Sequence, residues 1–393
     1  MSRFDADVIV IGGGPAGCAA AIRLVQQGHD VLVLERRSEA SNGAEAIESG
    51  ELLAPGTQHE CDELGVAFDG PWVLDRMRGV RNVYPDLSWT YHALPEGISY
   101  LNVDRGGFDA ALRARLVAVG GRIAWSRRAT GLDVRADEAI VATAEGPEYR
   151  TPLVIDAGGR HALSPRVRKL RTDDPEFKQI AVALFFSAFP DAAVGFWDRH
   201  FYGERGAMIS GARIRPGLFR LVLEADLAEK QADRAKPAEF FERVAERFDP
   251  WFAQRLARAP RVGEAWAMAP LAYRVTAVAG DRLLLAGDAT GYLSPLTGMG
   301  VEFAMRMGRL AAVAAHRALA VGDCSASAFG GYVDDRRSEL ETAITYLRHV
   351  LRHLRDRDVL LRAAHDDEVR STIFGPPLGT VTDRGHLRDA RVG

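Results

Sequence analysis

The sequence is poor in cysteine and in lysine. Its three cysteines, Cys18, Cys61 and Cys324, lie far apart and form no CxxC pair or metal-ligand spacing. That pattern argues against disulfides and zinc, and it favours a reducing compartment. Basic residues are almost all arginine, since lysine occurs only at positions 169, 178, 230 and 236. Because the cysteines show no metal-ligand spacing, no metal site is expected.

Long apolar runs and an excess of one charge are also missing. No run approaches the roughly 18 to 20 residues that a transmembrane helix needs, and the first residues lack the features of a signal peptide. The formal net charge is -3, which disfavours nucleic acid or anionic lipid as a partner. We expect a cytoplasmic protein with no transmembrane segment that acts on a small molecule.

The first 35 residues carry a dinucleotide-binding pattern. The stretch "DVIVIGGGPAGCAAAIRLVQQGHDVLVLE" predicts a strand over 7–11, a helix over 15–28 and a second strand over 31–35. The three spaced glycines suit a tight turn, a close approach of pyrophosphate and close packing of helix on strand, and the acid ending the second strand suits a ribose. The candidate cofactor residues are Gly12, Gly14, Pro15, Ala16, Gly17, Glu35 and Arg36.

A second motif near the other end, "DRLLLAGDATGYLSPLTGMGVEF", selects FAD over NAD. NAD needs no second contact so far along the chain, whereas the ribityl chain and ring system of FAD extend well past the pyrophosphate. Asp288 ends an apolar run and is placed to bind ribityl hydroxyls. The backbone amides of the following turn would stabilise negative charge on the flavin. The candidates in this turn are Pro295, Gly298, Met299, Gly300 and Val301.

Taken together, four motifs resemble the FAD-dependent oxidoreductases of the para-hydroxybenzoate hydroxylase superfamily. They are "GGGPAG" with Glu35, "VDRGGFDAALRARL" (103–116), "VIDAGGRHALSPRVR" (154–168) and "GDATGYLSPLTGMG". The resemblance is closest to the branch of geranylgeranyl reductases and flavin-dependent halogenases. It implies that Arg105 lies against the flavin. It also implies an α/β fold, with a Rossmann-type, glutathione-reductase-like FAD-binding domain, an inserted β-rich substrate domain and a C-terminal helical segment.

The expected domains are discontinuous. Residues 1–71, 104–178 and 276–323 form the FAD-binding domain, residues 72–103 and 179–275 the substrate domain, and residues 324–393 a C-terminal helical region and tail. Alternating apolar and polar residues predict strands over 72–103 and 179–225. A helical period begins at Pro237, and Pro250 is expected to kink or divide this helix. From about 299 to 364 the chain is expected to be helical, with a solvated arginine-rich face over 336–357 and a loosely held tail.

Candidate residues for the substrate or for catalysis lie mostly in the expected substrate sheet, because aromatic and basic side chains there suit an aromatic or carboxylated ligand. No catalytic residue is assigned beyond this set, since the flavin carries the chemistry. The candidates are Trp197, His200, Arg213, Arg220 and Tyr273.

Departures from the family patterns reduce the number of activities that fit the sequence. Flavin-dependent halogenases use a lysine early in the chain and a WxWxIP run, and this chain has neither. Geranylgeranyl reductases usually carry a cysteine segment after the second strand and a YxWxFP stretch, which are also missing. The middle motif reads "DAGGR" where aromatic hydroxylases have an Asp-Gly pair that also serves nicotinamide binding. The electron donor is therefore either NAD(P)H directly or a partner flavin reductase.

Three functions stay open. The first is an FAD-dependent monooxygenase that hydroxylates a small, aromatic biosynthetic intermediate through a C4a-hydroperoxyflavin. The second is a reductase of carbon-carbon double bonds, as in the geranylgeranyl reductases. The third is a flavoprotein that modifies a polypeptide partner. The small-molecule substrate of the first two functions is either free or bound to a carrier.

Overall fold

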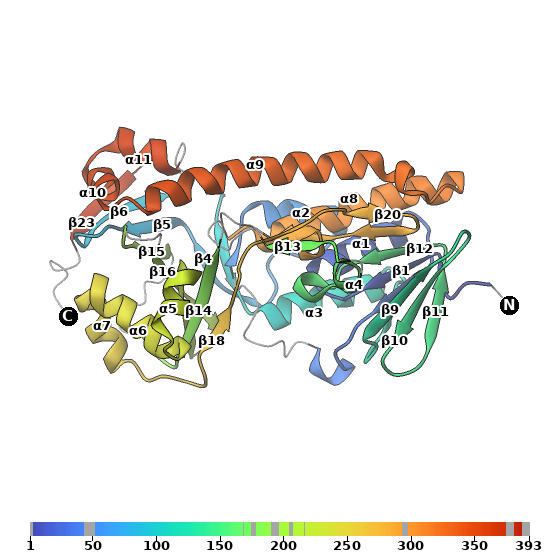
Figure 1. Ribbon diagram of the computed structural model, residues 1–393, viewed down its shortest axis with the longest axis horizontal. Helices are drawn as coiled ribbons and strands as arrows, with labels where there is room; N and C mark the ends of the chain where they lie inside the picture. The colour runs from blue at the N-terminus through green and yellow to red at the C-terminus, as the bar shows by residue number, and fades with distance from the viewer. Residues whose placement is uncertain are drawn as a thin grey trace. The chain divides into compact units, whose positions relative to one another are not determined.

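The computed structural model describes residues 3–42, 52–167, 169–173, 178–189, 196–203, 207–215, 217–292, 298–374 and 381–386. The chain forms two compact units, each assembled from segments far apart in the sequence (Figure 1). Unit 1 comprises Met1–Trp72, Arg105–Asp173 and Tyr273–Thr342. Unit 2 comprises Val73–Asp104, Asp174–Ala272 and Ala343–Gly393.

Unit 1 is built on a six-stranded sheet with the order β20-β21-β12-β1-β2-β8. All neighbours are parallel except the edge pair of β20 and β21. Buried on both faces, β1 consists of the uninterrupted apolar run VIVI, as central parallel strands do. The strands are β1 (Val8–Ile11), β2 (Val31–Leu34), β8 (Arg122–Ala124), β12 (Leu153–Asp156), β20 (Ala279–Gly280) and β21 (Leu283–Leu285).

The register of this sheet brings three motifs to one edge. Ile11 pairs with Asp156, and Asp156 pairs in turn with Leu285. Since these strands are parallel, the segments after β1, β12 and β21 all leave the sheet at its carboxyl edge. The glycine turn, the "DAGGR" segment and the turn with Asp288 therefore converge, as ligand-binding segments of open α/β sheets do.

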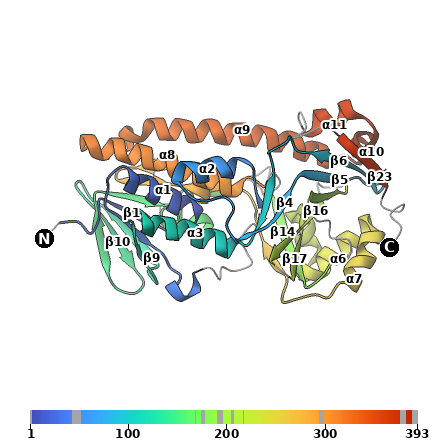
Figure 2. The same cartoon turned by 180° about the vertical axis from the view of Figure 1, so that it is seen from behind.

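Helices of unit 1 cover this sheet. The predicted strand–helix–strand unit is confirmed, with α1 (Pro15–Gln26) between β1 and β2. Figure 2 shows α1 beside α3 (Arg105–Ala118) and α8 (Gly300–Val321), and α1 packs against both. Unit 1 also contains α2 (Gly56–Leu64), α4 (Leu163–Val167), the antiparallel strands β9 (Ala129–Val134), β10 (Ala139–Thr143) and β11 (Glu148–Thr151), and the small sheet of β13 (Arg171–Asp173), β19 (Tyr273–Val275) and β22 (Gly291–Tyr292).

Unit 2 contains an eight-stranded sheet with the order β18-β14-β17-β16-β15-β5-β6-β23. Its neighbours are antiparallel, except for the parallel pair of β15 and β5. The strands predicted from alternation are therefore present. They are β5 (Gly79–Val83), β6 (Ser88–Ala93), β14 (Gln179–Phe186), β15 (Phe196–Phe201), β16 (Met208–Arg215), β17 (Leu218–Asp226), β18 (Trp266–Met268) and β23 (Val381–His386). Outside this sheet, β4 (Val73–Met77) pairs antiparallel with β7 (Tyr100–Val103).

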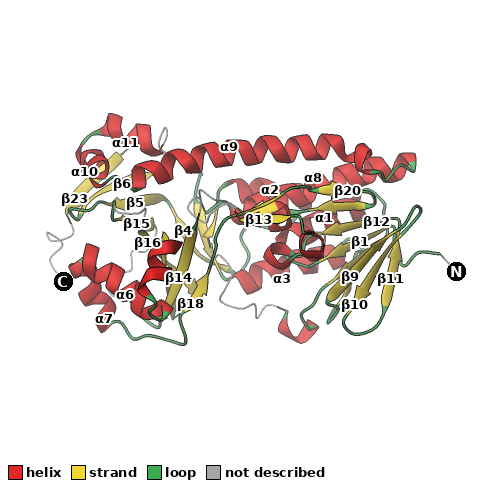
Figure 3. Cartoon of the chain, viewed as in Figure 1, coloured by secondary structure: helices red, strands yellow, loops and turns green. Residues whose placement is uncertain are grey.

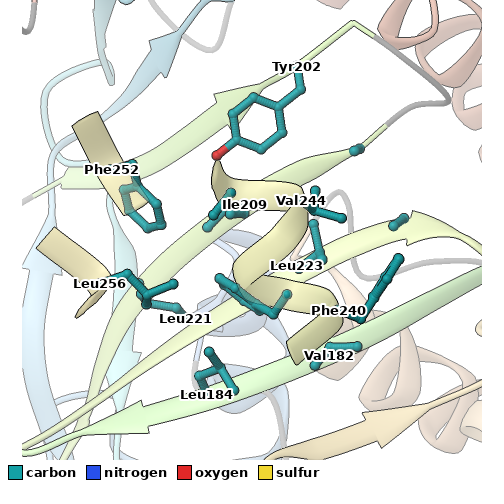
Figure 4. Packing of buried hydrophobic residues seen from close by; sticks show 14 of the residues in the cluster. Val182, Leu184, Tyr202, Ile209, Leu221, Leu223, Phe240, Val244, Phe252 and Leu256 are labelled. Atoms are coloured by element: carbon teal, nitrogen blue, oxygen red, sulfur yellow. The ribbon is translucent and has the colours of Figure 1, made fainter. Parts of the chain in front are cut away.

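One face of this sheet is covered by helices, which Figure 3 distinguishes from the strands. They are α5 (Leu227–Asp233), α6 (Pro237–Phe248) and α7 (Pro250–Arg258). The division of the predicted helix at Pro250 is confirmed, and Asp249 caps α7 by accepting a hydrogen bond from the amide of Phe252 at 2.8 Å. Val182, Ile209, Leu223 and other side chains of the sheet pack against Phe240 and Val244 of α6 in the core of unit 2 (Figure 4).

The C-terminal part is helical where helices are expected, from about 299 to 364. The first of these helices, α8, ends at Gly322 in the left-handed region, with φ 73°. The helices α9 (Gly330–Leu354), α10 (Arg357–His365) and α11 (Asp367–Phe374) follow it. The tail differs from the expectation of a loosely held terminus, because residues 381–386 form β23 on the edge of β6, where His386 bonds the carbonyl of Asp86 at 2.7 Å.

Candidate functional site: an FAD site in unit 1

The glycine turn between β1 and α1 is shaped for a close ligand. A Cβ on Gly17 would lie 1.9 Å from the carbonyl oxygen of Gly12, so no larger residue allows this packing of helix on strand. A Cβ on Gly14 would meet no heavy atom within 4 Å, so that side of the turn is open. With Pro15 in its first turn, α1 has no acidic residue and no side-chain cap there, which leaves its positive end available to a pyrophosphate.

Glu35 lies beside this turn at the end of β2 and is 6% exposed. Its Oε2 accepts a hydrogen bond from the amide of Gly13 at 2.7 Å, and its Oε1 accepts one from the amide of Arg37 at 2.9 Å. Each carboxylate oxygen has a further lone pair, so the group can still accept the two ribose hydroxyls. Arg36 is exposed. Among the described residues, no hydrogen bond or ion pair joins its side chain to the turn.

Sequence reasoning did not single out Arg113, which supports the same turn from α3. Arg113 is 1% exposed. Its Nε donates to the carbonyl of Gly13 at 2.9 Å, and its Nη1 donates to the side chain of Asn42 at 2.6 Å. The available signal was spacing, because Arg105, Asp109 and Arg113 follow one another at intervals of four on one helix face.

At the start of α3, Arg105 makes a fork-like ion pair with Asp109. Its Nη2 donates to both carboxylate oxygens of Asp109, at 3.0 and 3.2 Å. Such pairing fixes the plane of the guanidinium group. The positive charge of Arg105 also acts on the carboxyl of Asp288 and favours its ionised form.

Asp288 sits in a short 3-10 turn, Gly287–Thr290, directly after β21. Burial raises the pKa of its carboxyl to about 6, while the positive charges of Arg160, Arg105 and Arg336 oppose this rise. Within the described part of the chain, no hydrogen bond reaches this carboxylate. A partly buried acid with open acceptor positions suits the hydroxyls of a ribityl chain.

The helix that follows supplies the third part of the expected flavin contact. Gly298 has φ 66°, and α8 begins at Gly300 without a side-chain cap. Met299 is 43% exposed, and Val301 is 9% exposed. The first amides of α8 are therefore near the surface at a positive helix end. Pro295 lies outside the described residues.

The carboxylate of Asp156, in the "DAGGR" segment, accepts main-chain amides of the segment that follows it. Its Oδ1 accepts from the amide of Gly158 at 3.0 Å, and its Oδ2 accepts from the amide of Ser164 at 2.6 Å. The side chain is wholly buried, and burial raises the pKa of its carboxyl. Its position shapes the segment between β12 and α4 next to the glycine turn.

Tyr273, expected among the substrate residues, begins the third segment of unit 1 in β19. Its hydroxyl donates to the main-chain carbonyl of Asp288 at 2.7 Å. The guanidinium of Arg171 lies 3.9 Å from the centre of its ring, and that of Arg160 lies 5.2 Å from it. These contacts tie Tyr273 to the turn that carries Asp288, and a role in substrate binding stays a prediction.

The other substrate candidates lie in unit 2 on different parts of its sheet. His200 points into the helix-covered side, with its ring 5.2 Å from that of Phe252 and its Nδ1 3.5 Å from Oδ2 of Asp249. Arg213 is bound by Asp75, at 3.0 and 2.6 Å. Arg220 is 8% exposed in β17. For Trp197 only the backbone, in β15, belongs to the described part.

A row of polar side chains crosses the opposite face of this sheet. Thr90, Asn82 and Arg199 are direct partners in the registers of β6, β5 and β15. Nε of Arg199 donates to Oδ1 of Asn82 at 2.9 Å, and burial lowers the pKa of this guanidinium group. Thr90 continues the row by bonding the hydroxyl of Tyr84 at 3.1 Å. Sequence reasoning missed this polar row, because its members are brought together only by strand register.

None of the described helices is both long enough and apolar enough to span a bilayer. No group of three or more His, Cys, Asp or Glu side chains in the described part is arranged to hold a metal ion.

Comparison with known proteins places this site in a family. Residues 5–338 match the family described as FAD binding domain. A digeranylgeranylglycerophospholipid reductase of Methanosarcina mazei is 27% identical over 334 residues, covering 81% of this chain and 77% of that protein. A 1H-pyrrole-2-carbonyl-[peptidyl-carrier protein] chlorinase of Pseudomonas fluorescens is 26% identical over 368 residues, covering 84% and 80%.

Solved structures share the fold. A halogenase mutant in complex with FAD superposes with a TM-score of 0.78 at 17% identity, covering 92% of this chain and 79% of that chain. A second flavin-dependent halogenase gives a TM-score of 0.76 at 22% identity, covering 94% and 70%. The glycine turn, Glu35 and Asp288 fit the cofactor that this family binds. The chain therefore belongs to the FAD binding domain family, its relatives include reductases and halogenases, and it is an FAD-dependent oxidoreductase.

Proposed function

We propose that the chain is a monooxygenase that hydroxylates a small aromatic substrate carrying a polar group. The observation that carries this proposal is the polar row of Thr90, Asn82 and Arg199 in unit 2. A half-buried arginine beside amide and hydroxyl groups suits a carboxylate or phenolate better than a hydrocarbon chain. Specificity then comes from unit 2, while unit 1 binds the cofactor.

The overall reaction requires one electron pair and oxygen. Bound FAD supplies the redox chemistry, so that one atom of molecular oxygen enters the substrate and the other leaves as water, with NAD(P)H oxidised. In unit 1, Asp288 would accept hydrogen bonds from the ribityl chain, and Glu35 would accept them from the ribose. The first amides of α8 offer positive dipoles to negative charge on the ring system.

Two observations bear on the competing reactions. Halogenation is disfavoured because no lysine precedes Lys169, so the early lysine of the flavin-dependent halogenases has no counterpart. Double-bond reduction is the second candidate, supported by the relative from Methanosarcina mazei that is named as a reductase. A carrier-bound substrate is a further proposal, supported by the relative named for a peptidyl-carrier protein.

Labelled oxygen separates these reactions. The holoprotein is incubated under ¹⁸O₂ with NADPH, a flavin reductase and a panel of aromatic acids and phenols, offered free and attached to a peptidyl carrier protein. A product that gains one labelled oxygen supports hydroxylation, and a product that gains only two hydrogens identifies a reductase. Turnover of carrier-bound compounds alone would show that the carrier is part of the substrate.

A further inference from the structure

The turn that carries Asp288 is held through its main-chain carbonyls. Five of these oxygens accept hydrogen bonds from side chains, which fix the backbone between the end of β21 and the start of β22. Tyr332 donates to the carbonyl of Leu285, and Thr290 donates to that of Gly287 at 2.7 Å. Tyr273 donates to the carbonyl of Asp288 at 2.7 Å. Arg336 donates to the carbonyls of Thr290 and Gly291, at 3.2 and 3.4 Å.

Two of these donors come from one face of α9. Tyr332 and Arg336 are one helical turn apart, and they are 4% and 2% exposed. Nε of Arg336 also donates to Oγ1 of Thr290 at 2.7 Å, and this hydroxyl is the one that donates to Gly287. The sequence predicts a solvated arginine face here, which is correct for Arg337 and wrong for Arg336.

The charge of Arg336 strengthens this arrangement. Burial lowers the pKa of its guanidinium to about 10, so the group is still protonated at neutral pH. In the described part of the chain, Arg336 forms no ion pair. Its guanidinium group contacts the turn by hydrogen bonds and lies 4.7 Å from the centre of the Phe303 ring. Hydrogen bonds from a buried cation to carbonyls are strong, and they commit the side chain to this position.

From this geometry we propose that Arg336, with Tyr332, is a positioning residue that holds Asp288 where the ribityl chain of FAD binds. The two side chains hold the backbone of the turn, and the positive charge of Arg336 also favours the ionised form of Asp288. Neither role requires contact with the cofactor. This inference rests on FAD binding by unit 1, and it is independent of the reaction that the enzyme catalyses.

The test compares FAD with ADP, which contains the part of the cofactor that the glycine turn and Glu35 bind but has no ribityl chain. Apoprotein is prepared with Arg336→Met, and both dissociation constants are measured by calorimetry. We expect the dissociation constant of FAD to rise about tenfold or more, since charged hydrogen bonds are lost, and that of ADP to change less than about twofold. Arg336→Lys, which keeps the charge, should recover part of the FAD affinity.

A buried arginine of unit 2 gives the matched control. Arg370 is 3% exposed and also donates to main-chain carbonyls, those of Ala363 and Ala364. Arg370→Met should lower the free energy of unfolding and leave FAD binding unchanged. The proposal is overturned if Arg336→Met binds FAD like wild type, or if FAD and ADP weaken equally. Should that apoprotein not fold, Tyr332→Phe undergoes the same comparison, because it removes a single hydrogen bond.

Discussion

Tyr273 and Asp288 are joined by a hydrogen bond of 2.7 Å from the phenol to the main-chain carbonyl of the aspartate. The bond connects the small sheet of β13, β19 and β22 with the turn after β21. Burial also raises the pKa of the Tyr273 phenol well above its ordinary range, so it remains a donor at any physiological pH. Tyr273 therefore supports the turn that carries Asp288 from a segment that precedes this turn in the chain, whereas α9 supports it from a segment that follows.

Tyr273→Phe should weaken FAD binding by about threefold to tenfold, because one hydrogen bond contributes about 1 kcal/mol. The ring and its contact with Arg171 are retained, so the free energy of unfolding should fall only slightly. Fluorescence titration of the apoprotein with FAD measures the effect. An unchanged FAD affinity with a higher KM for substrate would instead assign Tyr273 to the substrate.

The raised pKa of Asp288 gives a pH dependence with a defined sign. Because its folded pKa, about 6, lies above the ordinary value of 3.8, the ionised carboxylate destabilises the apoprotein at pH 7. This penalty is relieved as the pH falls through 6 toward 4. Relative to Asp288→Asn, the unfolding free energy of wild type should rise by up to roughly 3 kcal/mol over this range, at 1.36 kcal/mol per pH unit. Urea denaturation of both apoproteins checks it.

FAD binding should follow the opposite trend. The ionised carboxylate accepts ribityl hydrogen bonds better than the neutral acid, so wild-type affinity should fall as the pH drops from 7 to 5. In Asp288→Asn the profile should be flat over this interval. Asp288→Ala should bind FAD about tenfold to a hundredfold more weakly at pH 7, since roughly 1 to 3 kcal/mol of hydrogen bonding is lost. Retention of FAD in the alanine variant at the wild-type level would disprove the assignment.

Glu35→Gln probes the other end of the cofactor. The glutamine amide can replace only one of the two oxygens that accept the amides of Gly13 and Arg37. One of these contacts is lost, together with the charge that the ribose hydroxyls require. We expect the dissociation constants of FAD and ADP to rise together, by about tenfold. A change for FAD alone would place Glu35 away from the ribose.

The sequence predicts the part of the site that is local. The positions of β1, α1, β2 and Asp288 follow from short apolar runs, glycine spacing and an acid at the end of a strand. The support of this site is not local. Arg113 reaches Gly13 from α3, and Arg336 reaches Thr290 from α9, only because tertiary packing brings distant helices to the turns. An arginine that donates to a remote carbonyl has the same sequence pattern as a solvated one, so helical periodicity cannot separate Arg336 from Arg337.

The face of a strand is subject to the same limit. Aromatic and basic residues of the unit 2 strands are predictable as a set, but their partners are not. His200 belongs to the side packed against Phe252, whereas Arg199, its neighbour in β15, belongs to the polar row with Asn82. Which side is covered by helices depends on α6 and α7, and these follow later in the chain. The alternation of side chains along a strand therefore divides the residues between the two faces of the sheet, but it does not tell which face belongs to the core.

The hydrogen bonds of Asp156 bear on how electrons reach the flavin. Both carboxylate oxygens of Asp156 accept main-chain amides, from Gly158 and Ser164. In "DAGGR" this residue therefore stabilises its turn, which leaves it poorly suited to bind a nicotinamide. The sequence shows no second glycine motif followed by a strand and an acid, so we expect no second dinucleotide site for NADPH.

We therefore expect NADPH alone to reduce the bound FAD slowly, and a flavin reductase to accelerate the reduction at least tenfold. The measurement is anaerobic bleaching of the flavin band at about 450 nm in the holoprotein, with NADPH alone and then with the reductase added. Free FAD with the same reductase provides the reference rate, and substrate added with NADPH alone tests whether the ligand itself activates reduction. Rapid bleaching by NADPH alone would show that the protein accepts hydride directly and needs no partner.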